Sequence, residues 1–210
     1  MRKARYENGF TLVELLLALM ITVIITAAVA TLASALNSAN AVTNDMGQKQ
    51  AQVRFAALRI SDLVRHCKLI CFAGPDDFAV WRADDTYNDG KINIGELVYI
   101  EAGPTHDHLR ICEFPSSDST AINLSSIDSL ATNWWSVYSS NINYMEVIPQ
   151  CNNVQFCFDD PGSPPNSKQV NILLDVVENK ITRQYQINAT LRVWAGNLLD
   201  GSGNIVSDDD

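Results

Sequence analysis

Basic residues are scarce in this chain of 210 residues, which carries a formal net charge of −9. Fifteen Lys and Arg stand against 24 Asp and Glu. The basic residues cluster only at Arg2, Lys3 and Arg5. Proteins that bind nucleic acids need clustered Lys and Arg to contact the phosphates. We therefore expect no nucleic-acid partner.

Sequence motifs of enzyme active sites are also lacking. The chain contains no G-x-S-x-G, no H-E-x-x-H and no phosphate-binding loop. Its three histidines are scattered, and its cysteines do not form the paired C-x-x-C spacing of a zinc site. The carboxylate pairs at 76–77 and 159–160 adjoin Pro or Gly, which is typical of turns. The sequence therefore predicts a protein that is not an enzyme.

Proline is absent before Pro75, and an apolar run without a charge follows Glu14. About 20 apolar residues suffice to cross the hydrocarbon core of a bilayer, and the range 10–36 is long enough. Leu, Ala and Met favour helix, and in lipid a helix satisfies its own backbone groups. We expect a transmembrane helix over 10–36. The basic residues in 1–9 predict that this end stays in the cytoplasm while the rest is exported.

Glu14 is unusual because it lies at the start of this apolar run. A carboxylate costs about 2.5–3.5 kcal/mol at the bilayer midplane and less near its edge. Phe10 precedes Glu14 by one helical turn on the same face. If the chain is cut after Gly9, Phe10 gains a free α-amino cation. That amine, on this subunit or on a neighbour, is the natural counter-charge for Glu14.

The segment Gly9-Phe10-Thr11-Leu12-Val13-Glu14 resembles the prepilin signature of type IV pilins and type II secretion pseudopilins. The resemblance implies cleavage between Gly9 and Phe10 by an inner-membrane prepilin peptidase, N-methylation of Phe10, and assembly with other pilins or pseudopilins. It also implies a bacterial inner-membrane protein with one membrane span and a periplasmic C-terminal domain. In this family the carboxylate matching Glu14 pairs with a neighbouring subunit's amine. Length favours a minor subunit, similar to the J-type minor pseudopilin or the W-type minor pilin.

Other interpretations remain open at this point. A secretory signal peptide would use the A-x-A-like sites at 28–30 or 33–35, although its apolar region is normally about 7–15 residues long and uncharged. A plain single-pass anchor explains the apolar run but not the signature. The chain could also be a pilus-tip adhesin that uses the loop containing Trp134 and Trp135, or a membrane-tethered protein of unrelated function. We expect these two aromatic residues to be partly buried in the loop.

The helix is expected to continue as an amphipathic segment over 37–68, because apolar residues recur there every three or four positions. Gly47 is the weak point of this helix. Short β-rich runs follow in the range 69–198, and 199–210 is expected to be a flexible acidic tail. Together these features predict an α+β, pilin-like fold in which the long helix packs on an antiparallel sheet. The expected apolar stripe comprises Ala39, Val42, Met46, Val53, Ala56, Ile60, Leu63 and Cys67. The expected strands are 78–81, 97–101, 108–114, 147–158, 170–177 and 181–193.

Residues 85–96 have the ligand spacing of a calcium loop of the EF-hand or dockerin type, with Gly90 at the sharp turn. Tyr87 stands where Asp or Asn normally supplies a further ligand. The alternative is an acidic hairpin turn at 88–90. Calcium is the only cofactor that the sequence suggests. Its candidate ligands are Asp85, Asp89, the Lys91 carbonyl, Asn93 and Glu96.

The chain has five cysteines, so at least one thiol is free or pairs with another chain. In an exported protein disulfides are permitted. Cys151 and Cys157 bracket a short stretch and are the candidates for a disulfide that closes a small loop.

Overall fold

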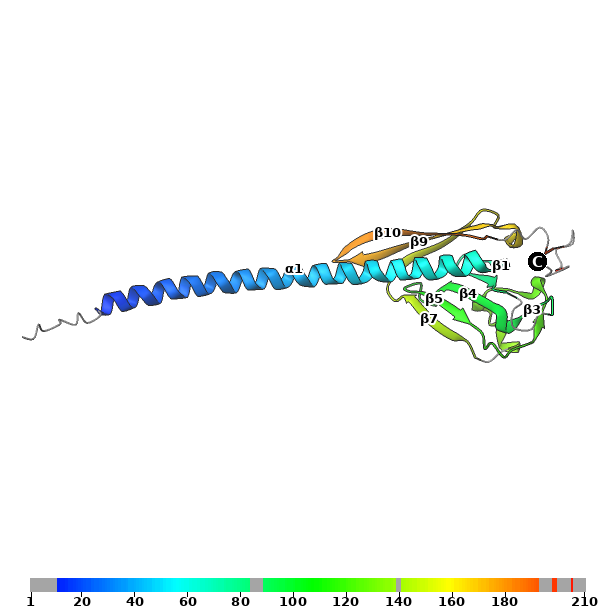
Figure 1. The fold of residues 1–210 in the computed structure, drawn as a ribbon, viewed down its shortest axis with the longest axis horizontal. Coiled ribbons are helices and arrows are strands. Elements are labelled where there is room, and N and C mark those ends of the chain that lie inside the picture. The colour runs from blue at the N-terminus through cyan, green and yellow to red at the C-terminus, as the bar shows by residue number, and fades with distance from the viewer. Residues whose placement is uncertain (1–10, 84–88, 139–140, 193–197, 200–204, 206–210) are drawn as a thin grey trace, which may run out of the picture. The chain divides into compact units, whose positions relative to one another are not determined.

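The computed structural model describes residues 11–83, 89–138, 141–192, 198–199 and 205. The chain divides into two compact units, Met1–Met46 and Gly47–Asp210, which are described separately. One helix, α1 (Leu12–His66), contributes residues to both units and is continuous through Gly47 (Figure 1). The predicted helix is therefore confirmed to within two residues at each end.

In the second unit, α1 lies between two antiparallel sheets (Figure 1). One sheet has five strands in the order β1-β2-β4-β5-β7, and the other has three in the order β10-β9-β8. The first comprises β1 (Leu69–Ala73), β2 (Asp77–Trp81), β4 (Leu97–Ala102), β5 (Leu109–Glu113) and β7 (Asn143–Ile148). The second comprises β8 (Asn152–Phe158), β9 (Gln169–Glu178) and β10 (Ile181–Thr190). A short ribbon pairs β3 (Ile92–Asn93) with β6 (Ala121–Ile122).

Short 3₁₀ helices connect the strands and cover one sheet. They are η1 (Ile94–Glu96), η2 (Leu124–Ser126), η3 (Leu130–Thr132), η4 (Trp134–Val137) and η5 (Pro164–Asn166).

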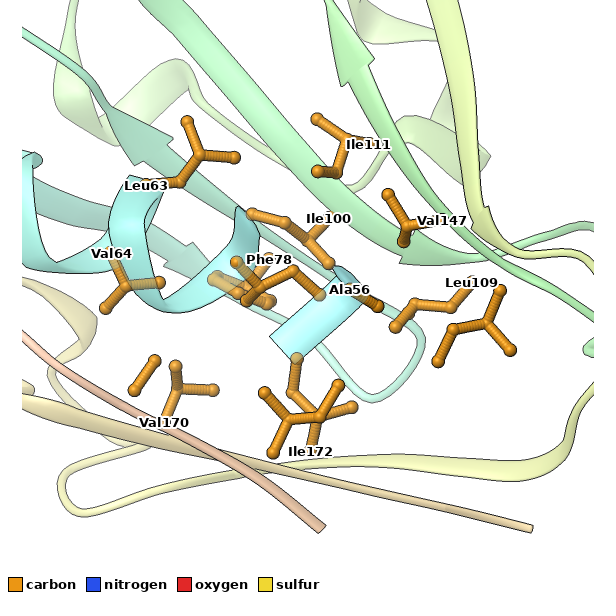
Figure 2. Packing of buried hydrophobic residues seen from close by; sticks show 14 of the residues in the cluster. Ala56, Leu63, Val64, Phe78, Ile100, Leu109, Ile111, Val147, Val170 and Ile172 are labelled. Atoms are coloured by element: carbon orange, nitrogen blue, oxygen red, sulfur yellow. The ribbon is translucent and has the colours of Figure 1, made fainter. Parts of the chain in front are cut away.

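The main core forms where the apolar stripe of α1 meets both sheets. Ala56 and Ile60 are fully buried there. Figure 2 shows α1 residues between Ile100 and Ile111 of the five-stranded sheet and Ile172 of the three-stranded sheet. The prediction that this stripe packs on sheet structure is confirmed for Val53, Ala56, Ile60, Leu63 and Cys67. It is wrong for Ala39, which is exposed, and Val42 and Met46 are only half-buried.

The central strands β2 and β4 of the five-stranded sheet are buried on both faces. Phe78 of β2 pairs with Ile100 of β4 and faces the main core, whereas the next pair, Ala79 and Tyr99, faces a second core. Because both faces are covered, every residue of β2 and β4 is buried, and their sequences are apolar apart from Asp77 and Glu101 and do not alternate. The second core lies beneath the 3₁₀ segments, and it includes Trp81, Cys112, Phe114, Ile127 and Leu130.

Most predicted strands are confirmed, with one correction. The range 147–158 was expected to be a single strand, but it contains the end of β7 and all of β8, which belong to different sheets. Pro149 and Gln150 form the bend between them. In the predicted tail, Leu199 and Ile205 are described; they pair in an antiparallel bridge and pack against the second core.

The predicted disulfide between Cys151 and Cys157 is contradicted. Both thiols are free; Cys151 is buried and Cys157 is exposed. The intervening residues form β8 and do not form a loop, so the two Cα atoms are separated by roughly 15–20 Å of strand. A disulfide requires Cα atoms within about 7 Å.

Candidate assembly helix and candidate calcium loop

The amino-terminal end of α1 is capped by its own side chains. Thr11 donates two hydrogen bonds to Glu14 Oε2, from its backbone nitrogen at 2.9 Å and from Oγ1 at 3.0 Å. The Glu14 backbone nitrogen donates in return to Thr11 Oγ1 at 3.3 Å. This is a capping box, in which both side chains satisfy backbone groups of the first turn. Sequence reasoning treated Glu14 only as a charge and missed this role, although the spacing Thr-x-x-Glu is its signature.

Only one oxygen of Glu14 is used by the cap. Within the described residues, Oε1 of Glu14 accepts no hydrogen bond. The carboxylate can therefore cap its own helix and still receive a cation from another chain. The predicted processing residues Gly9 and Phe10 lie outside the described residues.

The part of α1 that follows Glu14 is apolar on every side. The next charged residue is Asp45. From Leu12 to Leu36 the large apolar side chains are between 51% and 75% exposed, so they do not pack against one another in a core of their own. A helix that is apolar all round is typical of a membrane span. This is the one described helix that is long and apolar enough to cross a bilayer, with a mean hydropathy of 2.7 in its most apolar window.

The three threonine hydroxyl groups in this range are satisfied within the helix, as lipid requires. Thr22 Oγ1 donates to the Ala18 carbonyl at 2.7 Å, and Thr26 Oγ1 donates to the Thr22 carbonyl at 2.6 Å. At about 1.5 Å per residue, the range 12–36 extends about 37 Å, which exceeds the roughly 30 Å hydrocarbon core. The range therefore has the length and the chemistry of a transmembrane helix.

The candidate calcium loop retains several features of the predicted spacing. Gly90 has φ of +70°, the left-handed conformation that the predicted turn requires of it. Asp89 Oδ1 accepts hydrogen bonds from the Lys91 backbone nitrogen at 3.0 Å and from Asn93 Nδ2 at 3.1 Å. Asn93 and Glu96 are fully buried. The structure thus brings together Asp89, Asn93 and Glu96, while Asp85 lies outside the described residues.

The flanks of this loop are strands and a 3₁₀ turn, not the paired helices of an EF-hand. β3 places Asn93 at the start of η1, and η1 ends at Glu96. A Cβ added to Gly95 would lie 2.7 Å from the Pro115 carbonyl oxygen, so only glycine fits where these segments meet. In the described part of the chain, no group of three or more His, Cys, Asp or Glu side chains is assembled for a metal. The described oxygen donors are two carboxylates, one amide and the backbone.

A hollow of about 330 Å³ lies on the five-stranded sheet and is lined in part by Trp135 and Tyr144. Its charged groups already have structural partners. Arg110 forms an ion pair with Glu101, and its guanidinium carbon lies 4.1 Å from the centre of the Tyr144 ring. Asp77 accepts hydrogen bonds from Ser129 Oγ at 3.0 Å and the Leu130 nitrogen at 2.8 Å, which hold η3 in place.

Burial raises the pKa of Asp77 above its usual range, and the neighbouring carboxylates Glu101 and Asp76 add to this. The aromatic residues of the same region have a packing role. Trp134 lies 6.2 Å from Tyr99 and 6.3 Å from Phe114, measured between ring centres. Both tryptophans pack against the second core, so the prediction that they are partly buried is confirmed. The most exposed apolar side chain of this loop is instead Val137, at 82%.

Comparison with protein families gives a match at the amino-terminal end of the chain. Residues 4–30 match the family described as the prokaryotic N-terminal methylation motif. Comparison with curated proteins and with solved structures gave no match. The chain therefore carries the amino-terminal signature of type IV pilins and pseudopilins, and the match includes Gly9, Phe10 and Glu14.

The rest of the structure agrees with this class. The fold is α+β, with one long amino-terminal helix that packs on antiparallel sheets, as the pilin-like prediction stated. The motif implies processing by a prepilin peptidase and assembly with other pilins. Together with the apolar helix, it is consistent with a membrane-anchored, structural subunit precursor.

Proposed function

We propose that this protein is a minor subunit of a type II secretion pseudopilus or a type IV pilus. The prepilin peptidase cuts between Gly9 and Phe10, and Phe10 is then N-methylated. The helix spans the bacterial inner membrane before assembly, with the C-terminal domain in the periplasm. The observation that carries the proposal is the methylation motif at residues 4–30, which continues into an apolar helix whose large side chains are exposed from Leu12 to Leu36.

The physical reason for assembly is the exposed apolar surface of α1. Apolar side chains over most of 12–36 would be in contact with water unless lipid or protein covered them. Lipid covers them before assembly, and the helices of neighbouring subunits cover them in the filament. Farther along, Phe55 and Leu58 are 55% and 73% exposed on α1 in the second unit. They offer a further apolar contact for a neighbouring subunit.

Glu14 aligns one subunit with the next in this proposal. Cleavage gives each subunit a cationic amine at Phe10, and Glu14 of a neighbour is its partner. The capping box holds the Glu14 carboxylate at the helix start and leaves Oε1 available. An ion pair in an apolar environment fixes the register between two subunits, because a misaligned subunit would bury both charges without partners.

The size of the chain supports a minor subunit, since major subunits of this family are typically shorter. The finer resemblance to the J-type pseudopilin or W-type pilin is part of this proposal. Deletion of the gene tests it: loss of secretion or loss of pili, restored by the wild-type gene, would support the proposal. Filaments and secretion that are both intact without the protein would contradict it.

A further inference from the structure

We propose that the loop containing Asp89, Asn93 and Glu96 binds a calcium ion that stabilises the C-terminal domain. The proposal starts from Glu96, whose side chain is fully buried. Its Oε2 accepts hydrogen bonds from Trp81 Nε1 at 3.1 Å and from the Asn93 backbone nitrogen at 3.4 Å. Its Oε1 is buried without any hydrogen-bond partner among the described residues.

A buried carboxylate oxygen without a partner is costly. Buried charges are normally paired with another charge or coordinate a metal. Glu96 forms no ion pair with any described residue. A cation next to Oε1 removes this cost.

Neighbouring groups supply further oxygen ligands. Oδ1 of Asn93 is likewise buried without a hydrogen bond among the described residues. Asn93 Nδ2 bonds to Asp89 Oδ1, so the second carboxylate is held beside this amide. In sequence the three residues stand at the fifth, ninth and twelfth positions of a calcium loop that starts at 85, and the Lys91 carbonyl stands at the seventh.

The chemistry of this donor set favours calcium over other metals. All the donors are oxygens. Histidine and cysteine, the usual ligands of zinc and copper, are absent from this donor set, which argues against these two metals. Calcium accepts six to eight oxygens in flexible geometry, with water completing the set, whereas magnesium demands a near-ideal octahedron. Gly90, at φ of +70°, provides the turn between the fifth and seventh ligands.

Calcium bound here would act on the fold through Trp81. The indole of Trp81 is fully buried in β2 and donates to the same carboxylate that would hold the metal. The metal would thereby connect β2 to β3 and η1, which border the second core. Binding in the exported domain would couple its stability to external calcium, for which modules outside the cell have dissociation constants of about 0.1–1 mM.

The test is thermal unfolding of the full-length protein in detergent micelles, followed by tryptophan fluorescence. Calcium chloride, added after treatment with chelator, is expected to raise the melting temperature by about 3–6 °C at ten times the dissociation constant. Magnesium at the same concentration should give a clearly smaller shift. An equal shift with both ions, or none with calcium, would overturn the proposal.

Two variants locate the site. Glu96→Gln keeps an acceptor for Trp81 but removes the charge, and Asp89→Asn removes the second carboxylate. Both should lose the calcium shift, and Glu96→Gln should melt no lower than wild type in chelator. Asp62→Asn, a change to an exposed carboxylate of α1, is the matched control and should keep the shift. If Glu96→Gln does not fold, Asp89→Asn decides alone. An undiminished shift in the variants would place the ion elsewhere and refute the site.

Discussion

Glu14 has two possible roles, and the structure provides a way to separate them. It caps its own helix through Thr11, and in the proposal it also pairs with the amine of a neighbouring subunit. Glu14→Gln separates these roles because glutamine can still complete a capping box but carries no charge. Glu14→Val removes both functions, and Thr11→Val removes the capping hydroxyl while keeping the charge.

The expected magnitudes differ enough to be measured. Loss of one partner from a buried ion pair costs about 3–5 kcal/mol, which corresponds to about a hundredfold to several thousandfold in assembly. Loss of a capping side chain costs about 0.5–2 kcal/mol. Glu14→Gln and Glu14→Val should therefore both be nearly absent from filaments, whereas Thr11→Val should be incorporated at a moderately reduced level. None should lose membrane insertion, because each change replaces a charged or polar side chain with a less polar one, which makes insertion more favourable.

The assay compares the amount of each variant in sheared filaments and in the membrane fraction, in cells that lack the wild-type gene. If Glu14→Gln assembles like wild type while Glu14→Val does not, the capping box is the important function and the ion-pair argument is refuted. If all three variants assemble normally, neither role of Glu14 matters for assembly.

Three further predictions concern the C-terminal unit. Ile60→Ala should reduce the free energy of unfolding by about 2–5 kcal/mol in chemical denaturation. Leu58→Ala, at a site that is 73% exposed, should change this free energy by less than about 0.5 kcal/mol and should reduce only incorporation into filaments. Equal destabilisation by the two changes would contradict the packing described. A maleimide at pH 8 should label the exposed thiol of Cys157 but not that of Cys151, because burial raises the pKa of the Cys151 thiol to about 11. If both thiols react only after a reductant is added, the two cysteines form a disulfide and the structure described is wrong. Because the pKa of Asp77 is raised, its ionisation destabilises the folded state as the pH rises above about 4. Asp77→Asn should therefore raise the melting temperature at pH 7 and have little effect near pH 3, and an equal effect at both would refute this assignment.

The long helix and most strands could be predicted from the sequence because their signals are local. The apolar run, the spacing of Val53, Ala56 and Ile60, and the alternation in β10 each specify one element and its buried face. The ranges of α1, β2, β4 and β9 were accordingly close to those observed.

What could not be predicted depends on contacts between distant segments. The apolar run at 147–158 gives no local sign that Ile148 ends a strand of one sheet while Val154 belongs to another. The same limit explains the Cys151–Cys157 error, since spacing alone does not distinguish a loop from a strand. It also explains why the apolar stripe was assigned one sheet when α1 packs on two.

The candidate sites also combine local sequence patterns, which could be predicted, with contacts between distant segments, which could not. The signature around Phe10 and Glu14 and the spacing of the candidate calcium loop are both local patterns that can be read from the sequence. The burial of Glu96 and its bond to Trp81 depend on β2 lying beside η1, so the unpartnered oxygen that carries the calcium proposal emerged only from the fold.

The most direct test of the account is the mass of the mature protein purified from the membrane of its own host, together with its amino-terminal sequence. We expect a chain that begins at Phe10 with one added methyl group on its amine and retains the entire apolar helix. A chain that still begins at Met1, or one cut near Ala30 or Ala35 so that the helix is removed, would contradict the filament-subunit proposal.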